Sequence, residues 1–598
     1  MGIRGFSAAV SRYGILLPLN SDIVIDGPAL VHRISEYCMR YRPPSSGFAA
    51  LPPYATLNRM VICWLNELKS HNVNVRRIYF DGYLPPSKWE VRKTRLLRQS
   101  RAMRAMISSY PTGSAKPPGN PHWHVQGGLH LTSDVTFKNT TRKPPFLIPA
   151  VLEALRHDQD WGPLVKVVPG EADMFCAQDV RENGGTLITS DSDLLVQDLG
   201  LEGNVVFFWT IVEGAKTVVK AQKMSLHHIN RQLGIENLGG LPRVAFEMQR
   251  SDRPWGDIDF DIAVQNAKQD REDTLNSPAY RSFMEELEMK HYVPSHHPVL
   301  SPLSNLDPRI SEVVIQTLLL GESKSTTSEK KALRGPETLS MFLPVLIENR
   351  NSLSAWTQST DVRQLAYSFL QTFARRRAEW IIEYRTLDSL VSQTGRRIRI
   401  PDQEEIVADC VQLVALLEKL NESFSSTSHM QWLAFAVYWD IRLSTSEKSK
   451  ITSATLVRSA TSQPNTYSWD LIHFTAQVHG HLYSLRIMKQ ILDVVFAMDQ
   501  DLPAPVQQLH NCLASLPLIT EWPTIENMSD TLIEFDQIGG LAITADIAGV
   551  PKGKLDALRC IRKKMTEKKE REKKKKIIKV KKPVSTNPYS ILDQENIG

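Results

Sequence analysis

Short apolar runs rich in branched side chains alternate with longer, helix-like segments over the first 250 residues of the chain. Each run has the length of a buried strand, and the runs are Ile23–Asp26, Arg77–Asp81, Leu164–Val168, Thr186–Ser190 and Val205–Trp209. Between them, Ala55–Leu68 is amphipathic, and Ala172–Glu182 follows a Pro-Gly pair typical of a helix start. This alternation predicts an α/β domain with a parallel sheet and helices on both faces.

Beyond about residue 255 the strand signals largely fade, and helix-like segments dominate, for example Val362–Tyr384, Gln403–Leu420 and Ser484–Met498. Within the α/β part, residues 95–145 interrupt the alternation with a basic, Met-rich segment and a loop rich in Gly, Pro and His. An insertion of that length is usually functional or disordered. The predicted domains are residues 1–255 (α/β), 256–555 (mostly helical) and 556–598 (a lysine-rich tail, expected to be disordered).

Composition excludes several classes of protein. No run of eighteen apolar residues occurs, so the sequence does not predict a membrane span. The six cysteines are scattered without a CxxC pair, which argues against a zinc ribbon and against a disulfide framework. A reducing compartment, nuclear or cytoplasmic, fits this cysteine usage best. The oligomeric state is left open.

The positive charge of the chain is concentrated in its tail. Fourteen Lys or Arg and three Glu lie between Arg559 and Lys582, a balance of +11, which leaves the other residues at about −5 of the total of +6. Charge alone therefore does not predict a nucleic-acid-binding body. The tail fits a nuclear localisation signal best, with a nonspecific nucleic-acid tether and a solvated charge run as alternatives.

Acidic residues follow four of the predicted strands, and these residues are Asp26, Asp81, Glu171, Asp173, Asp191 and Asp193. A lone Asp at a strand end is ordinarily a cap or turn residue, but four acidic strand ends, two of them paired, exceed what capping explains. Ligands of a parallel sheet bind beyond the carboxyl ends of its strands. Carboxylates gathered there repel one another unless hard divalent cations bind them. Two Mg²⁺ or Mn²⁺ ions at such a site would support phosphodiester hydrolysis.

Five motifs in order carry a family resemblance: MGIRGF, IVIDGPAL, IYFDGYLPPSK, VPGEADMFCAQ and TLITSDSDLLV. Together they resemble the flap-endonuclease/XPG superfamily of structure-specific nucleases over residues 1 to about 255. Within it the chain looks most like the asteroid group, which carries this nuclease domain before a long helical region. The resemblance implies a PIN/flap-endonuclease-like fold and a metal-dependent nuclease acting on DNA, or on RNA. It also implies work in DNA repair in the nucleus.

The resemblance also implies roles for single residues. The six strand-end acids match the family's metal ligands, and Asp252 would be the seventh. Lys88 and Arg95 occupy the positions whose basic side chains hold the scissile phosphate, and the family uses its N-terminal glycine, here Gly2, near the active site. Seven residues separate Lys88 from Arg95, which places both on one face of a helix.

The sequence departs from the family after Asp252. Flap endonucleases have a glycine-rich hairpin there that grips duplex DNA, whereas this chain has the acidic stretch RPWGDIDFDIAVQNAKQDREDT. Nucleic acid, DNA rather than RNA, would instead contact Arg92, Lys93 and Arg98, the tail, or a partner protein bound to the helical region. The alternative is an inactive nuclease-fold scaffold in RNA regulation. A DxD-type phosphatase centred on Asp191 and Asp193 leaves the other acids unexplained.

Overall fold

A computed structural model describes most of the 598-residue chain. The described residues are 3, 5–19, 22–41, 51–116, 123–131, 143–213, 218–249, 259–269, 274–320, 338–385, 395–427, 429–446, 451–459, 466–498 and 501–550. The lysine-rich tail predicted over 556–598 lies outside them. No helix within these ranges combines the length and the apolar composition of a membrane span.

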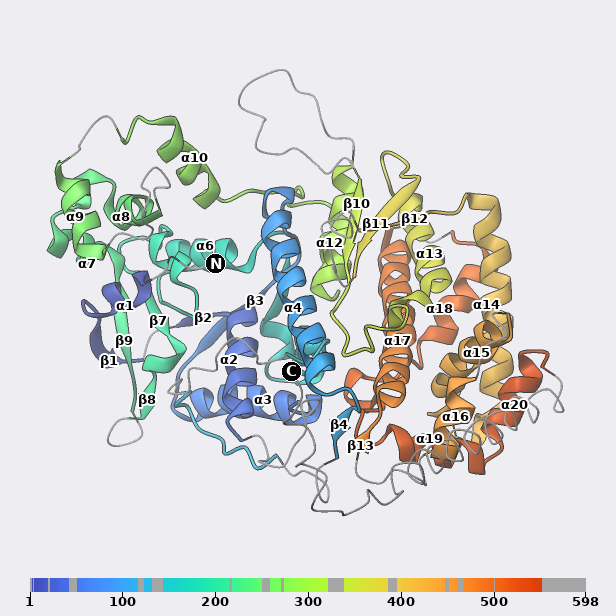
Figure 1. The fold of residues 1–598 in the computed structure, drawn as a ribbon. Helices are drawn as coiled ribbons and strands as arrows, with labels where there is room; N and C mark the ends of the chain where they lie inside the picture. Colours follow the sequence, from blue (N-terminus) through green and yellow to red (C-terminus); the bar gives the residue numbers. More distant parts are fainter. Residues whose placement is uncertain are drawn as a thin grey trace, which may run out of the picture.

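One large sheet organises the first part of the chain (Figure 1). Its strands are β1 (Ile15–Pro18), β2 (Ile23–Asp26), β3 (Val75–Asp81), β5 (Val165–Val168), β6 (Thr186–Thr189), β7 (Asn204–Phe207), β8 (Val212–Glu213) and β9 (Val219–Ser225). The order is β1-β9-β7-β6-β2-β3-β5, with β8 also paired to β9. The five predicted strands form its parallel centre, which confirms the predicted fold class.

Three strands at one side of the sheet were not predicted. β9 runs antiparallel to β7, and β1 and β8 run antiparallel to β9. All four residues of β1 are exposed, and β9 alternates buried with half-buried positions. Neither strand has the continuous apolar run that marks a strand covered on both faces.

The alternation of side chains along β2 shows how the sheet is covered on both faces. Ile23 and Ile25 pack with α2 (Gly27–Met39), α3 (Tyr54–Ser70) and α5 (Leu147–His157). Val24 points to the other face. The helices whose apolar side chains pack there are α1 (Phe6–Ser11), α6 (Ala172–Asn183), α7 (Leu226–Leu233), α8 (Gly240–Gln249) and α9 (Phe260–Gln269).

The second part of the chain is mainly helical but contains a second sheet. Its strands are β10 (Leu339–Phe342), β11 (Trp380–Tyr384) and β12 (Arg396–Arg399), with β10 parallel and β12 antiparallel to the central β11. The prediction of one helix over Val362–Tyr384 is therefore wrong in its second half. Helix α13 (Thr360–Phe369) gives way to β11, whose bulky, branched side chains suit a strand.

The other two predicted helices are confirmed as α14 (Gln403–Ser423) and the last half of α17 (Trp469–Met498), which is buried along most of its length. The remaining helices are α4 (Trp89–Ser109), α10 (Pro278–Leu287), α11 (Leu300–Leu303), α12 (Pro308–Leu319), α15 (Met430–Ser446), α16 (Thr452–Ser459), α18 (Ala504–Leu513), α19 (Met528–Gln537) and α20 (Gly540–Ile547). The predicted insertion contributes a short strand, β4 (Ser114–Ala115), which pairs with β13 (Thr466–Tyr467) of the second part.

The two parts of the chain share a hydrophobic core. Tyr83, Phe146 and Ala150 of the first part are buried in the same cluster as α12, α13 and α17. A buried ion-pair network crosses the same boundary. Arg486 of α17 donates to both carboxylate oxygens of Asp307, at 2.7 and 2.9 Å, and to Glu153 of α5, at 2.5 Å. The domain boundary at residue 255 stays a prediction, but the parts are packed as one body.

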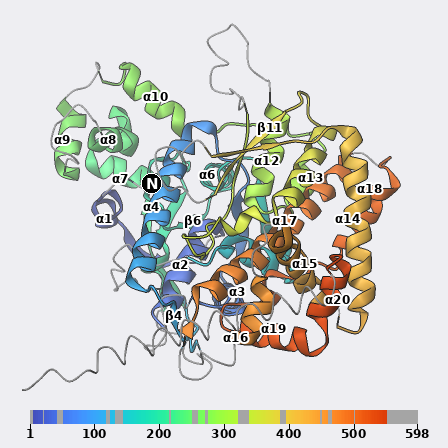
Figure 2. The same ribbon diagram turned by 45° about the vertical axis from the view of Figure 1, so that its right-hand side comes forward.

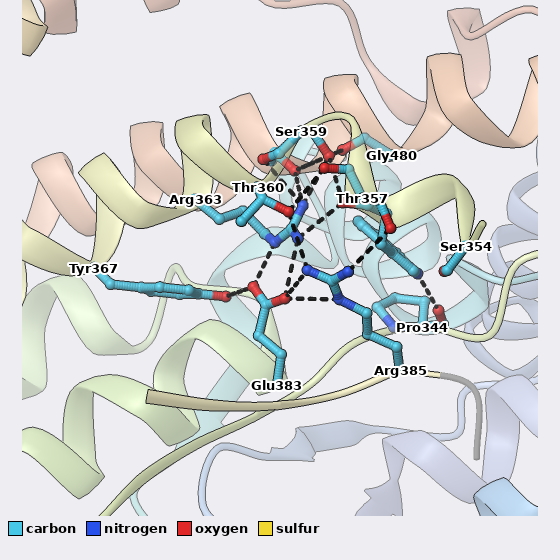
Figure 3. A network of polar contacts seen from close by, with 12 residues as sticks. Pro344, Ser354, Thr357, Ser359, Thr360, Arg363, Tyr367, Glu383, Arg385 and Gly480 are labelled. Carbon is cyan, nitrogen blue, oxygen red and sulfur yellow. Dashed lines mark hydrogen bonds and ion pairs between the residues drawn. The ribbon is translucent and has the colours of Figure 1, made fainter. Parts of the chain in front are cut away.

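A second buried network ties β11 to the helices beside it (Figure 3). Glu383 accepts hydrogen bonds from Arg363 of α13, from Arg385 and from the hydroxyl of Tyr367. Burial opposes its charged form, but the two guanidinium groups prevail and lower the pKa of Glu383 to about 2. Arg363 also donates to Ser484 of α17, so the small sheet and the central helix are held together.

Replacing Arg486 with methionine should destabilise the whole protein. The change leaves Asp307 and Glu153 buried without their cation, which typically costs about 3–5 kcal/mol. Denaturant unfolding measures this cost. Lys489→Met on the same helix is the control, because Lys489 is a third exposed and lies 3.9 Å from Asp493, so about 0–1 kcal/mol is expected. Equal effects of the two changes would show that the boundary network contributes nothing.

Candidate active site

The strand order of the large sheet brings the predicted acidic residues to one edge. Asp26 ends β2, and Asp81 ends the neighbouring β3. Glu171 and Asp173 follow β5 beside β3, whereas Asp191 and Asp193 follow β6 on the other side of β2. All six lie beyond the carboxyl ends of four adjacent parallel strands, as predicted.

Asp26 stands in the middle of this edge. Its side chain caps α2 by accepting a hydrogen bond from the Ala29 N–H at 3.1 Å, and its second oxygen accepts from the Thr189 hydroxyl at 2.7 Å. The pKa of Asp26 is raised to about 7 overall. Burial is the main cause and the charges of Asp81 and Asp191 contribute, while the two hydrogen bonds oppose the rise. The proton is therefore retained near neutral pH when no cation is present.

Asp81 connects β3 to the start of α6. One carboxylate oxygen accepts the Ala172 N–H at 2.8 Å. Burial raises the pKa of Asp81 to about 6, and the charge of Glu171 adds to the rise. The next residue has to be Gly82, because a Cβ there would collide with the Val168 carbonyl and come within 2.7 Å of the Ser311 hydroxyl.

Asp173 is influenced by the charges of four of the other acids. It occupies the first turn of α6, and its pKa is raised well above the usual value, first by burial. The charges that raise it further come from both sides of the edge, from Asp26, Asp191, Asp81 and Glu171. Asp173 therefore interacts with acids at the ends of three different strands, β2, β3 and β6, as well as with its neighbour Glu171.

Asp191 and Asp193 sit on a 3-10 turn after β6. The Asp191 side chain accepts the Asp193 N–H at 3.0 Å, and the Asp191 N–H donates to the Thr189 hydroxyl at 2.9 Å. Burial and the charge of Asp191 raise the pKa of Asp193 to about 6, while Lys88 and a backbone hydrogen bond from Ile3 oppose the rise. The start of the described chain therefore reaches this edge, although Gly2 and Asp252 lie outside the described residues.

The donor chemistry of this edge fits a hard divalent cation. Its possible ligands are carboxylate oxygens, the kind that Mg²⁺ and Mn²⁺ prefer. Burial together with the neighbouring acids raises the pKa values of Asp26, Asp81 and Asp193, so their charged forms are disfavoured without a cation. Among the described residues, no three His, Cys, Asp or Glu side chains already surround one point as they would around an ion. The acids share one edge of the sheet without converging on a single position.

A comparison with protein families relates part of this site to a known family. Residues 143–400 match the model of the family described as XPG domain containing. This match supports a place for the chain in the XPG-like nuclease superfamily. A comparison with curated proteins found no match.

The XPG match includes Glu171, Asp173, Asp191 and Asp193, whereas Asp26 and Asp81 precede it in the chain and join them through the sheet. Its end at residue 400 falls directly after β12. The matched unit therefore reaches beyond residue 255 and takes in the three-stranded sheet. The match does not test the asteroid subgroup.

Lys88 is a basic residue in direct contact with the acids. It ends a 3-10 turn just before α4, and its ammonium group forms an ion pair with Glu171. Burial lowers the pKa of Lys88, but Glu171, Asp173 and Asp193 more than offset this and raise it overall. Arg95 does not join this pair. It is exposed on α4, where its charge acts on His32 of α2 and on Lys143.

Arg92, Lys93 and Arg98, the other side chains predicted to contact nucleic acid, differ in their ion pairing and solvent exposure. Arg92 forms a bidentate ion pair with Glu312 of α12 and lies 4.3 Å from the Phe342 ring, so it holds the fold together. Lys93 pairs with Glu90 at 2.7 Å. Arg98 is exposed on α4. A nucleic-acid contact of these residues stays a prediction, and Arg98 is the one whose side chain is open to solvent.

Two residues at the site were not predicted from the sequence. Thr189 connects the two halves of the edge by bonding to Asp26 and to the Asp191 backbone. A hydroxyl residue two positions before an acidic pair was the available signal. Glu312 lies 220 residues from its partner Arg92, and no local pattern marks it.

The raised pKa of Asp26 predicts that Asp26→Asn stabilises the metal-free protein. The contribution of a carboxyl whose folded pKa is raised is fully present below its unfolded pKa and is lost as the pH rises through the folded value. For Asp26 that window runs from pH 3.8 to about 7. The variant should therefore gain at pH 8, by on the order of 4 kcal/mol, and the gain should vanish towards pH 4.

Thermal unfolding without metal at a series of pH values measures this difference. Asp22→Asn is the matched control, since Asp22 precedes the same strand at its opposite end and its side chain is 51% exposed. The control should change the stability by no more than about 1 kcal/mol, because its ion pair with Arg76 is half exposed. A lower melting temperature for Asp26→Asn at every pH would contradict the charge repulsion described above.

Proposed function

We propose that the protein is a metal-dependent nuclease that hydrolyses phosphodiester bonds in DNA or RNA. The observation that supports this most is the placement of six carboxylates beyond four adjacent parallel strands, with Lys88 beside them, in an XPG-like chain. Both features suit phosphodiester cleavage, because negative charge develops on the phosphate and has to be stabilised.

The strand-end acids would hold two ions, Mg²⁺ or Mn²⁺. The proposed ligands are Asp26, Asp81, Glu171, Asp173, Asp191 and Asp193, with Asp252 as the seventh. Such ions, when bound, activate water and stabilise charge on the attacking and leaving oxygens. The surrounding residues of the protein position these carboxylates. Thr189, Ala29 and Ala172 fix the Asp26 and Asp81 carboxylates by hydrogen bonds before any substrate arrives.

Lys88 and Arg95 would act on the phosphate. The ammonium of Lys88 is already at the site, and exchange of Glu171 for a phosphate oxygen needs only a side-chain movement. Arg95 would meet the nucleic acid on the exposed side of α4, and Arg98 beside it. Gly2, Arg92 and Lys93 remain weaker candidates for contact with the nucleic acid.

The finer parts of the proposal rest on the sequence. We place the protein in the asteroid group, with DNA preferred to RNA, a nuclear location supported by the tail, and a role in DNA repair. A partner protein would bind the helical region. One observation favours a second function: Lys88 already neutralises Glu171, an arrangement that an inactive nuclease-fold scaffold in RNA regulation can retain.

A cleavage panel tests the proposal. Purified full-length protein is mixed with single-stranded, flapped and nicked DNA and with RNA, in Mg²⁺, Mn²⁺ or a chelator. We expect metal-dependent cleavage. Asp191→Ala and Asp26→Asn should reduce it by more than about 100-fold, because loss of outer-shell partners alone costs metal sites about 10–100-fold.

The control for this panel is Asp22→Asn, which changes an acid of the same strand outside the site and should keep full activity. Calorimetric titration of Mn²⁺ into the same variants gives a second measurement that does not depend on activity. Wild-type protein that binds Mn²⁺ yet cuts none of the substrates would favour the scaffold. Protein that neither binds Mn²⁺ nor cuts would overturn the metal site itself.

A further inference from the structure

Helix α12 connects the small sheet to the acidic site. Its residues from Ile310 to Leu319 are all buried, and it lies alongside β10 (Figure 1). Figure 2 shows α12 and β11 from a second side. The small sheet in turn covers one side of α4, where Leu96 packs with Phe342 and Tyr384. One side of the helix that follows Lys88 is therefore covered by elements from the second part of the chain.

Glu312 makes the polar contact between α12 and α4. Both of its carboxylate oxygens accept hydrogen bonds from Nη1 of Arg92, at 2.8 and 2.6 Å. The Glu312 side chain is 6% exposed and that of Arg92 19%, so water screens the pair little. Hydrogen bonds between charged groups in such surroundings are about twice as strong as neutral ones.

The Arg92 guanidinium has a second, apolar support. It lies 4.3 Å from the ring centre of Phe342 at the end of β10, and Trp89 of α4 meets the edge of the same ring at 6.0 Å. Cation–π and aromatic contacts of this kind add to the ion pair. Arg92 is thus held by a carboxylate of α12 and by an aromatic side chain of the small sheet.

Helix α12 is itself fixed on the small sheet. The Gln316 amide bonds to both the carbonyl and the N–H of Ser340, at 2.9 and 2.8 Å, and Arg309 donates to the Phe342 carbonyl. Arg309 also lies within the field of Arg92 and Glu312. Without the Glu312 charge, the electrostatic repulsion between Arg92 and Arg309 would be less compensated.

The same helix contacts the chain beside Asp81. Gly82 packs so closely on α12 that a Cβ would come within 2.7 Å of the Ser311 hydroxyl. Ser311 and Glu312 are adjacent, so one turn of α12 contacts the end of β3 and also holds Arg92. Lys88 and Arg92 are one helical turn apart, and a shift of the start of α4 moves both.

We propose that Glu312 is a positioning residue for the acidic site: by holding Arg92 it fixes the start of α4 and thereby the placement of Lys88 against Glu171. The hydrogen bonds that Glu312 accepts come from Arg92, which is not one of the proposed metal ligands. Its effect on catalysis rests on the proposed nuclease function, whereas its effect on α4 does not.

The test uses full-length protein with Glu312→Gln, which keeps the shape of the side chain and removes its charge. Hydrogen exchange of residues 89–98 should become about tenfold faster, because a hydrogen bond to a charged group is lost. On a cleaved substrate, kcat should fall about tenfold while KM changes less than about twofold, the pattern of a group that acts after binding. Phe342→Leu, which removes the other support of Arg92, should act in the same direction.

Glu286→Gln on α10 is the control, since this glutamate is exposed and distant from α4 in the chain. It should leave exchange and kinetics unchanged. If Glu312→Gln unfolds the protein, Glu312→Asp keeps the charge and should give intermediate exchange and an intermediate kcat.

Unchanged exchange in α4 for both Glu312→Gln and Phe342→Leu would overturn the proposal, whatever the activity. A fall in kcat with unchanged exchange would also overturn it. If the wild type cleaves no substrate, the nuclease function fails, and faster exchange in α4 would still support the positioning contact.

Discussion

The mutual repulsion of six carboxylates at one edge of a sheet is the constraint on which the rest of the structure depends. The parallel strand order brings them there, and burial then raises the pKa values of Asp26, Asp81, Asp173 and Asp193. Hydrogen bonds from Thr189 and from backbone N–H groups stabilise single acids, but the nearby ammonium of Lys88 cannot balance six charges. The metal-free site is therefore electrostatically unfavourable, and it persists because the surrounding structure holds the acids in place.

The second part of the chain supplies much of that enforcement. Its hydrophobic core continues into Tyr83 and Phe146 of the first part, and Arg486 joins α5, α12 and α17 by buried ion pairs. The match to the XPG family ends directly after β12, so the small sheet is part of the matched unit and not an addition to it. A nuclease domain ending at residue 255 would expose the face of α4 that packs on β10 and β11.

The parts of the structure that the sequence predicted are those encoded by neighbouring residues. The central strands are covered on both faces and read as unbroken apolar runs, and the acids directly follow them. β1 was not predicted because it is an exposed edge strand without an apolar run. β11 was not predicted because its apolar residues also fit a helix, and its partner strand β10 lies about forty residues earlier in the chain. Lys88 is close to Asp81 in the sequence and was found. Glu312 could not be found, since only the fold brings it to Arg92.

The packing around α4 also limits how nucleic acid could reach the acids. Arg92 is bound to Glu312 and Lys93 to Glu90, so neither charge is readily available to a phosphate. The exposed cations, Arg95 and Arg98, lie on the remaining surface of α4, and the field of Arg95 reaches α2, the helix that Asp26 caps. Phosphate contacts dominate nucleic-acid affinity, and the chain outside its tail carries a net negative charge. Under the proposed function, the strand would therefore approach along the exposed side of α4, where Arg95 and Arg98 lie.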